Sequence, residues 1–409
     1  MTKLGFIFLS LVFMSTKAWG WIIGVAAVVV IAVALMSRPA TPYQPAPSPE
    51  AKAPQEPSSV KLGVVIPLTG DAAAIGLPLQ HALQLAVDEI NAKGGVAGKP
   101  IEVYFEDGKC DGKEATGAIS KLISINKVSF VFGGACSSEM LAMAPIAEAA
   151  KVIVMSPSAT NPDITTAGDY IFRTAPSDAT AGKIAALYAV NEMKAKKAAV
   201  ISEQTDYAQG LRGVFKIFFT QNAGEIVSDE VYASKDTDFR AQITKVKAAK
   251  PDVIYILPQT PATGVLLVKQ LKQAGVTTPL LTAEAILGRD VIAQNKADLE
   301  GLVGIEQYFN AAAPKTAEFI AAYKQKYNEE LAFPAYQVNM YSQAYLLKEA
   351  IEKVGFSTDA VKTFLYGVKN WEHALGSLSF DVNGDPLTDY AIQKVKDGKL
   401  EQVQIFKPQ

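Results

Sequence analysis

Two loops rich in serine and threonine follow neighbouring apolar segments, and their polar groups could bind an anion. The first loop follows residues 128–132 and opens a helix expected at 138–150, and the second follows residues 152–155. A strand, a helix and a second strand in this order are typical of a parallel sheet. In such sheets, small ligands bind at the edge formed by the carboxyl ends of the strands. A helix N-terminus there attracts a carboxylate, although serine at this point also serves as a plain helix cap. The residues that we expect to hold the charged groups of a ligand are Ser137, Ser158, Ala159 and Thr160.

An acid and a tyrosine stand at the ends of two strands expected in the middle of the chain. Glu284 follows the apolar segment 279–282, and Tyr207 follows the segment 198–204. Facing a cleft, Glu284 would supply the counter-charge of an ammonium group; elsewhere it would be a solvated loop residue or a helix cap. Tyr207 could cover a ligand from above. Together with the carboxylate site, these residues predict an amino acid as the ligand.

Signatures of enzymes, metal sites and nucleic-acid binding are missing from the sequence. Gly112 and Gly117 have the spacing of a phosphate-binding loop, but alanine and isoleucine follow where lysine and serine or threonine are needed. The two histidines, His81 and His373, lie far apart and have no neighbour at ligand spacing. The net charge is −2 and no basic block occurs, which argues against nucleic acid. We therefore expect no catalysis, no cofactor and no metal.

The two cysteines each follow an expected strand by a few residues, on the same edge of the sheet. In an exported protein, Cys110 and Cys136 so placed favour a disulfide. Two separate buried thiols are the alternative, and the absence of a C-x-x-C motif argues against a redox role.

Buried strands alternate with helices from Lys61 onward, and the alternation starts again after residue 177. This pattern predicts an α/β protein with two lobes, each built on a doubly wound parallel sheet. Helices are expected at 317–327 and 336–354, and an antiparallel strand pair at 389–395 and 400–406 closes the chain.

The amino terminus differs in composition from the rest of the chain. Residues 20–36 carry no charge and would form a helix about 25 Å long, at the lower limit for a bilayer span. We expect residues 1–37 to anchor the protein in the inner membrane, with a cleaved signal peptide as the alternative. Residues 38–60 hold many prolines and predict an extended linker. The folded part would then lie outside the cytoplasm.

Four passages give the chain a resemblance to a known family from Lys61 to its end. They read AVDEINAKGGVAGKPIEVYFEDGKCD, GGACSSEMLAMAPIAE, SPSATNPDIT with GDYIFRTAPSD, and TDYAQGL. The chain resembles the periplasmic leucine/isoleucine/valine-type binding proteins of ABC transporters, which have the type I periplasmic binding fold. The resemblance implies two lobes joined by a hinge of three crossovers, near Ser177, Gln307 and Asp381. The first lobe would comprise residues 61–176 and 307–381, and the second residues 177–306 and 382–409.

The resemblance also implies a role for each candidate residue. Cys110 and Cys136 would form the family's disulfide, and Ser137, Ser158 and Thr160 would receive the α-carboxylate and α-ammonium groups of an amino acid. Tyr207 would close over the ligand, and Glu284 would pair with the ammonium.

Two positions depart from the family in the region expected to bind the ligand's side chain. Ile75 stands in a loop where leucine-type members carry an aromatic residue, and Gln259 stands where they carry a tyrosine. A branched-chain or aliphatic amino acid is favoured, and a polar, amide or aromatic ligand stays open. The resemblance implies a monomeric binding protein in the periplasm that delivers its ligand to an ABC permease. A ligand sensor that docks onto a membrane receptor is the alternative.

Overall fold

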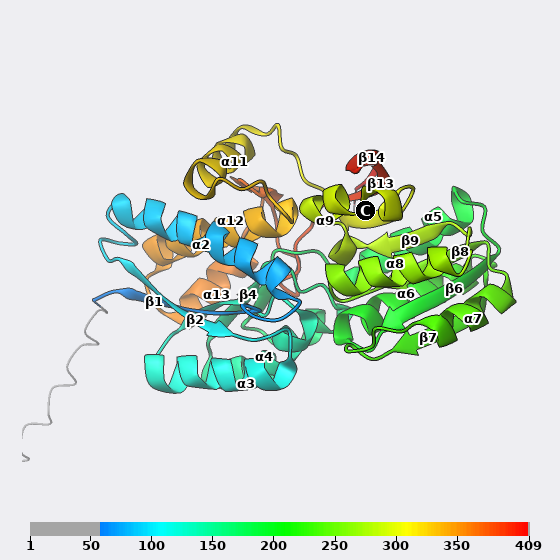
Figure 1. The fold of residues 1–409 in the computed structure, drawn as a ribbon. Coiled ribbons are helices and arrows are strands. Elements are labelled where there is room, and N and C mark those ends of the chain that lie inside the picture. The colour runs from blue at the N-terminus through cyan, green and yellow to red at the C-terminus, as the bar shows by residue number, and fades with distance from the viewer. Residues whose placement is uncertain (1–57, 408–409) are drawn as a thin grey trace, which may run out of the picture. The chain divides into compact units, whose positions relative to one another are not determined.

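The computed structural model describes residues 58–407, and two central sheets organise them (Figure 1). The first sheet has five parallel strands in the order β2-β1-β3-β4-β5. These strands are β1 (Val60–Ile66), β2 (Ile101–Asp107), β3 (Phe130–Gly133), β4 (Ile153–Ser156) and β5 (Ile171–Arg173). We call this sheet and its covering helices the first lobe.

Helices cover both faces of the first sheet, so its central strands are mostly apolar. In β1, Leu62 and Val64 face one core cluster and Val65 faces the other. The helices on the first face are α2 (Ala73–Ala92), α11 (Pro314–Tyr327), α12 (Pro334–Val354) and α13 (Thr358–Tyr366). Those on the second face are α3 (Gly112–Lys121), continued by the π-helical turn η1 (Leu122–Asn126), and α4 (Ser137–Ala150). The 3-10 turn η2 (Pro162–Thr166) follows β4.

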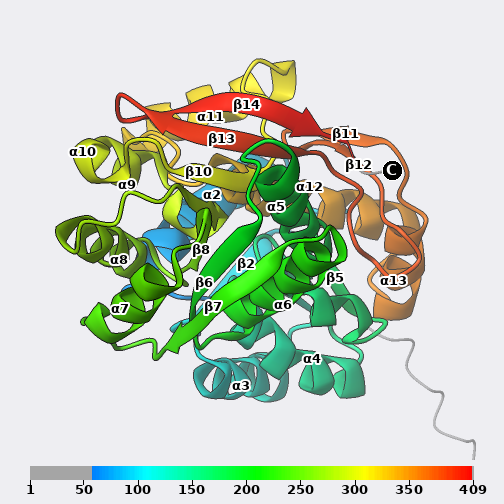
Figure 2. The same ribbon diagram turned by 90° about the vertical axis from the view of Figure 1, so that its right-hand side faces the viewer.

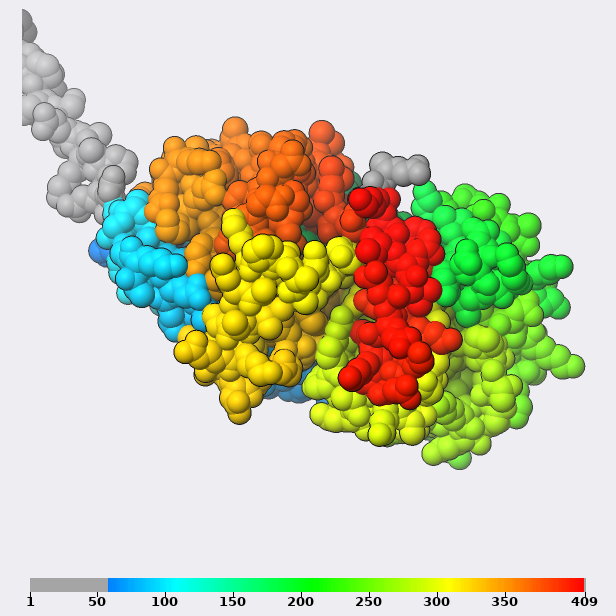
Figure 3. Space-filling model, turned by 90° about the horizontal axis from the view of Figure 1, so that it is seen from above, coloured from blue at the N-terminus to red at the C-terminus, as the bar shows by residue number. Residues whose placement is uncertain are grey.

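The second sheet has seven strands in the order β14-β13-β10-β9-β8-β6-β7, and with its helices it forms the second lobe. Five strands are parallel, namely β6 (Lys197–Glu203), β7 (Glu225–Tyr232), β8 (Val253–Leu257), β9 (Leu280–Ala283) and β10 (Val303–Gln307). The antiparallel pair β13 (Tyr390–Lys396) and β14 (Lys399–Phe406) completes the sheet beside β10 (Figure 2). β14 is mostly exposed and forms the red strip visible from above (Figure 3).

Helices α5 (Asp178–Asn191) and α6 (Asp206–Gln221) cover one face of the second sheet. The other face carries α7 (Arg240–Ala249), α8 (Pro261–Gln273), the 3-10 turn η3 (Glu284–Ile286), α9 (Arg289–Gln294) and α10 (Lys296–Leu299). The chain passes between the sheets three times: from β5 to α5, from β10 to α11, and from the small hairpin β11 (Trp371–His373) and β12 (Gly376–Leu378) to β13.

The predicted α/β class with two largely parallel sheets is confirmed, as is the closing antiparallel pair. Helix α13 and the hairpin β11–β12 were not predicted, because both elements are short. No helix within residues 58–407 is long and apolar enough to cross a membrane. The anchor predicted at residues 1–37 and most of the linker at 38–60 lie outside the described residues.

Candidate ligand-binding site

The two serine-rich loops lie together at the carboxyl ends of β3 and β4, and Ser156 ties them to each other. Its hydroxyl donates to the carbonyl of Gly134 at 2.8 Å and accepts from the backbone N–H of Ala159 at 2.9 Å. The Ser158 hydroxyl donates to the carbonyl of Ala135 at 2.9 Å. Sequence reasoning missed Ser156, because a buried serine at a strand end has no distinguishing pattern around it.

The two predicted hydroxyls differ in the hydrogen bonds that they have left to make. Ser137 accepts a bond from the backbone N–H of Asn161 at 3.2 Å, and its own O–H has no acceptor in the described part of the chain, so it can donate to a carboxylate. The Ser158 hydroxyl donates its proton to the Ala135 carbonyl, so its oxygen can only accept a further hydrogen bond, which an ammonium group could donate. Ser137 also begins α4, whose first N–H groups have no partner within the helix.

Thr160 connects the two lobes through a residue that sequence reasoning missed. Its hydroxyl donates to the Asp178 carboxylate at 2.7 Å, and its carbonyl accepts from the Asp178 backbone N–H at 2.7 Å. Asp178 lies in the first turn of α5, where an acid is ordinarily a favourable partner of the helix dipole, so its sequence context shows no sign of a site. Burial, and then the negative charge of Glu284, raise the pKa of Asp178 well above its usual range.

Glu284 is buried at the start of η3, with only 7% of its surface exposed. Its Oε1 atom has no hydrogen-bond partner among residues 58–407. Burial raises its pKa from 4.5 to about 7, against the influence of the Tyr336 and Tyr207 phenols, which favour the charged form. The two neighbouring acids disfavour each other's ionisation, and a ligand cation would favour the charged form of both.

Three tyrosines surround the two acids and keep water away from them. Tyr207 lies in the first turn of α6, Tyr255 comes from β8, and Tyr336 reaches the site from α12 of the first lobe. Burial raises the pKa of all three phenols well above the usual value, so they stay neutral. Tyr336 and Glu284 line a narrow pocket together with residues from β10 and from the start of α12. Sequence reasoning identified only Tyr207.

The two residues expected beside the ligand's side chain lie on different lobes. Ile75 belongs to the apolar cluster of the first lobe, together with Ala135 and Tyr336. Gln259 follows β8 in the second lobe, and its backbone N–H donates to the Glu203 carboxylate at 2.8 Å. The Gln259 amide nitrogen lies 3.8 Å from the Cys136 sulfur, across the boundary between the lobes.

A disulfide joins Cys110 and Cys136, as expected, and fixes the loop that carries Ser137. Glu139 braces both half-cystines, because its carboxylate accepts the backbone N–H of Cys110 at 2.9 Å and that of Cys136 at 3.0 Å. Burial raises the pKa of Glu139 to about 8.

A fully buried arginine fixes the chain where it passes between the lobes. Arg173 ends β5 and forms two bonds to the Asp385 carboxylate, at 2.6 and 2.7 Å, in the third passage. It also donates to the Asn161 carbonyl at 2.8 Å. The Asn161 side chain in turn donates to the carbonyl of Asp206 in the second lobe at 2.6 Å.

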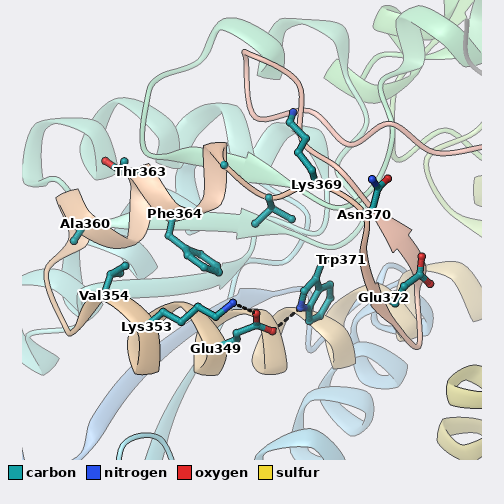
Figure 4. A pocket seen from close by; sticks show the side chains of 12 residues that line it. Glu349, Lys353, Val354, Ala360, Thr363, Phe364, Lys369, Asn370, Trp371 and Glu372 are labelled. Carbon is teal, nitrogen blue, oxygen red and sulfur yellow. Dashed lines mark hydrogen bonds and ion pairs between the residues drawn. The ribbon is translucent and has the colours of Figure 1, made fainter.

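A larger hollow, of about 710 Å³, lies on the first lobe between α12, α13 and β11 (Figure 4). Three of its polar groups pair with one another, because Glu349 accepts from Lys353 and from the Trp371 ring N–H, both at 2.7 Å. None of the predicted site residues lines it. Within the described part of the chain, no group of histidine, cysteine, aspartate and glutamate residues could hold a metal ion.

Most of the chain matches a known protein family. The family described as "Periplasmic binding protein" matches residues 59–399. The Leu/Ile/Val-binding protein homolog 3 of Brucella melitensis is 29% identical over 347 residues, which are 84% of this chain and 93% of the relative.

Two solved structures of substrate-binding proteins are also similar to the chain. The branched-chain amino acid transporter substrate binding protein LivJ of Streptococcus pneumoniae, in complex with isoleucine, is 31% identical with a TM-score of 0.78, and the match covers 86% of this chain and all of that one. A solute binding protein from Rhodopseudomonas palustris in complex with 3,4-dihydroxybenzoic acid is 27% identical with a TM-score of 0.75, and the match covers 86% and 98% of the two chains.

Proposed function

Because the chain belongs to the periplasmic binding protein family, we propose that it captures an amino acid between its two lobes and delivers it to an ABC permease. Membership makes the chain a solute-binding protein of the type that serves transporters, and not an enzyme, as the sequence predicted. The family also implies a location in the periplasm.

The observation that carries the proposal is the buried carboxylate of Glu284, one oxygen of which has no partner among the described residues. A buried charge is costly unless it is paired. An α-ammonium group of the ligand would pair with it, and the Asp178 carboxylate next to it would add to the attraction. The Ser158 oxygen, which can still accept a hydrogen bond, would take another ammonium proton.

The loop around Ser137 supports a place for the ligand's α-carboxylate. Its hydroxyl proton is free, and the first turn of α4 offers N–H groups and the positive end of a helix dipole. A carboxylate here and an ammonium at Glu284 would engage both lobes at once. The ligand would thereby hold the lobes together, as in hinge closure.

The names of the relatives support a branched-chain or aliphatic side chain. They include Leu/Ile/Val-binding proteins and a complex with isoleucine. The neighbour bound to 3,4-dihydroxybenzoic acid suggests an aromatic acid as a second candidate. Such a ligand has no ammonium and would leave Glu284 unpaired, so we favour the amino acid.

A thermal-shift screen of the protein against the twenty amino acids and a set of benzoic acids tests this proposal. We expect one or more amino acids to raise the melting temperature, since a ligand bound only by the folded state stabilises it. A shift with a benzoic acid and none with any amino acid would refute the ammonium site at Glu284.

Delivery to a permease would be helped by the predicted membrane anchor. An anchor at residues 1–37 and a linker at 38–60 would confine a monomeric binding protein near its permease and raise its effective concentration there. The mass of the protein recovered from membranes decides between an anchor and a cleaved signal. Co-purification with a receptor in place of permease subunits would favour the sensor over the transport protein.

A further inference from the structure

We propose that Gln259 binds the side chain of the ligand, and that the protein selects an amino acid of branched-chain size with a neutral polar end, such as a hydroxyl or a carboxamide. This inference rests on the proposed function, because it concerns the side chain of the amino acid whose ammonium group Glu284 would bind.

The carboxamide of Gln259 is buried without a strong partner. The residue is 8% exposed, and its Oε1 atom has no hydrogen-bond partner among residues 58–407. Within the same residues, its Nε2 atom has one hydrogen-bond partner, the sulfur of Cys136 at 3.8 Å, and a sulfur is a weak acceptor. Exchanging the oxygen and the nitrogen would still leave one of the two without a partner. Buried polar side chains of native proteins are nearly always hydrogen-bonded, so this one indicates a partner that a ligand supplies.

The position of Gln259 connects it with the rest of the ligand site. It follows β8 at the edge of the second sheet where Glu284 follows β9, and these two strands are neighbours. Its contact with Cys136 brings the carboxamide against the loop of the first lobe that continues into Ser137. The free end of Gln259 is therefore placed at the junction of the two lobes, beside the groups proposed to hold the ligand's backbone.

The surroundings of Gln259 decide which polar side chains suit it. Ile75 is buried in the apolar cluster of the first lobe that also contains Ala135, the residue before Cys136. The buried carboxylate of Glu203 accepts the Gln259 backbone N–H and puts negative charge next to the site, which disfavours an acidic side chain. A hydroxyl or a carboxamide on a short branched side chain would satisfy the Gln259 carboxamide and still contact the apolar wall.

Isosteric pairs of amino acids separate polarity from size. We would titrate the full chain in a calorimeter with threonine against valine, and with asparagine against leucine. The polar member of at least one pair should bind about tenfold more tightly or better, because its absence leaves Gln259 unpaired. Gln259→Leu should reverse the preference within that pair. Gln259→Met takes its place if the leucine variant does not fold.

Melting temperatures without ligand give an independent readout. Gln259→Leu should raise the melting temperature, because it removes a buried polar group that lacks a partner. Gln343→Leu is the control for loss of a strong bond. The Oε1 atom of this buried glutamine also lacks a partner among residues 58–407, but its Nε2 atom donates to the Thr174 hydroxyl at 2.7 Å, so its replacement should lower the melting temperature and leave the ligand preference unchanged.

Tighter binding of both apolar members, or an unchanged preference in Gln259→Leu, would overturn the role of Gln259 and leave the proposed function standing. Binding of lysine or arginine in place of the neutral amino acids would overturn it as well, and would point to Glu203. If no amino acid bound at all, the proposed function would fail together with this inference.

Discussion

Replacing Glu284 by glutamine removes a negative charge from the site and nearly preserves the size of the side chain. The carboxylate is buried, lies among three tyrosines and next to Asp178, and keeps one oxygen unpaired among the described residues. If it binds the ammonium of a ligand, the same substitution should have opposite effects on the free and the ligand-bound protein.

The free protein should become more stable. Burial raises the pKa of Glu284 from 4.5 to about 7, which corresponds to roughly 3 kcal/mol at about 1.36 kcal/mol per pH unit. This cost of ionisation is present above pH 7 and absent from the Glu284→Gln variant. We therefore expect the variant without ligand to melt at a higher temperature than the wild type at pH 8.

Ligand binding should become weaker. Truncating one partner of a buried charge pair costs about 2 kcal/mol or more, a loss of about 30-fold in affinity. The ammonium group would keep its hydrogen bond to Ser158 and its attraction to Asp178 in the variant, so the loss measures the charge of Glu284 itself.

Calorimetric titration with the amino acid found by the thermal-shift screen, and melting curves at pH 8, would measure both effects. Asp229→Asn is the control, since this partly buried acid of β7 already pairs with Arg212 at 2.6 Å and does not line the pocket of Glu284. It should destabilise the protein and leave affinity unchanged. Equal affinity of the wild type and Glu284→Gln, or a lower melting temperature of Glu284→Gln without ligand, would refute the reasoning.

The remaining predictions concern pH, the hinge, lobe contact and the disulfide. The contribution of Glu284 to stability without ligand is fully present below pH 4.5 and is lost as pH rises through about 7. The affinity for the amino acid should increase over the same range and then level off. Melting and titration series from pH 4.5 to 8.5 measure both effects, and a flat affinity profile would contradict the prediction. Arg173→Met leaves the Asp385 carboxylate buried without its partner and should cost about 3–5 kcal/mol in denaturant unfolding; a loss below about 1 kcal/mol would contradict the clamp. In α6, a Cβ at Gly210 would lie 2.9 Å from atoms of Asn161 and Pro162 in the first lobe, whereas a Cβ at Gly213 would have no neighbour within 4 Å. Gly210→Ala should therefore weaken ligand binding, and Gly213→Ala should not. Reducing the disulfide, which spans 26 residues, should lower stability by about 3 kcal/mol in urea unfolding; unchanged stability would assign the bond no structural role.

The fold could be predicted from the sequence in most of its elements, because the signals involved are local. The apolar segment and the serine-rich loop around Ser137 give β3 and α4, since strand burial and a helix start depend on residues close together in the chain. Glu284 and Gln259 could likewise be placed at strand ends by the apolar strands that precede them. The roles of both residues stay predictions that the experiments above test.

The partners of these residues depended on the tertiary structure alone. Gln259 contacts the sulfur of Cys136, which is 123 residues away in the sequence. Arg173 binds the carboxylate of Asp385, which is 212 residues away, and the chain passes between the lobes twice in that interval. Tyr336 and Asp178 reach Glu284 from other elements, and neither has a sequence context that marks it. The sequence determined which strand ends carry hydroxyls, acids and amides, because that follows from order along the chain. Which of these groups are buried together, and which are left without a partner, was decided only when the two lobes came together, because burial and charge pairing depend on distances in space.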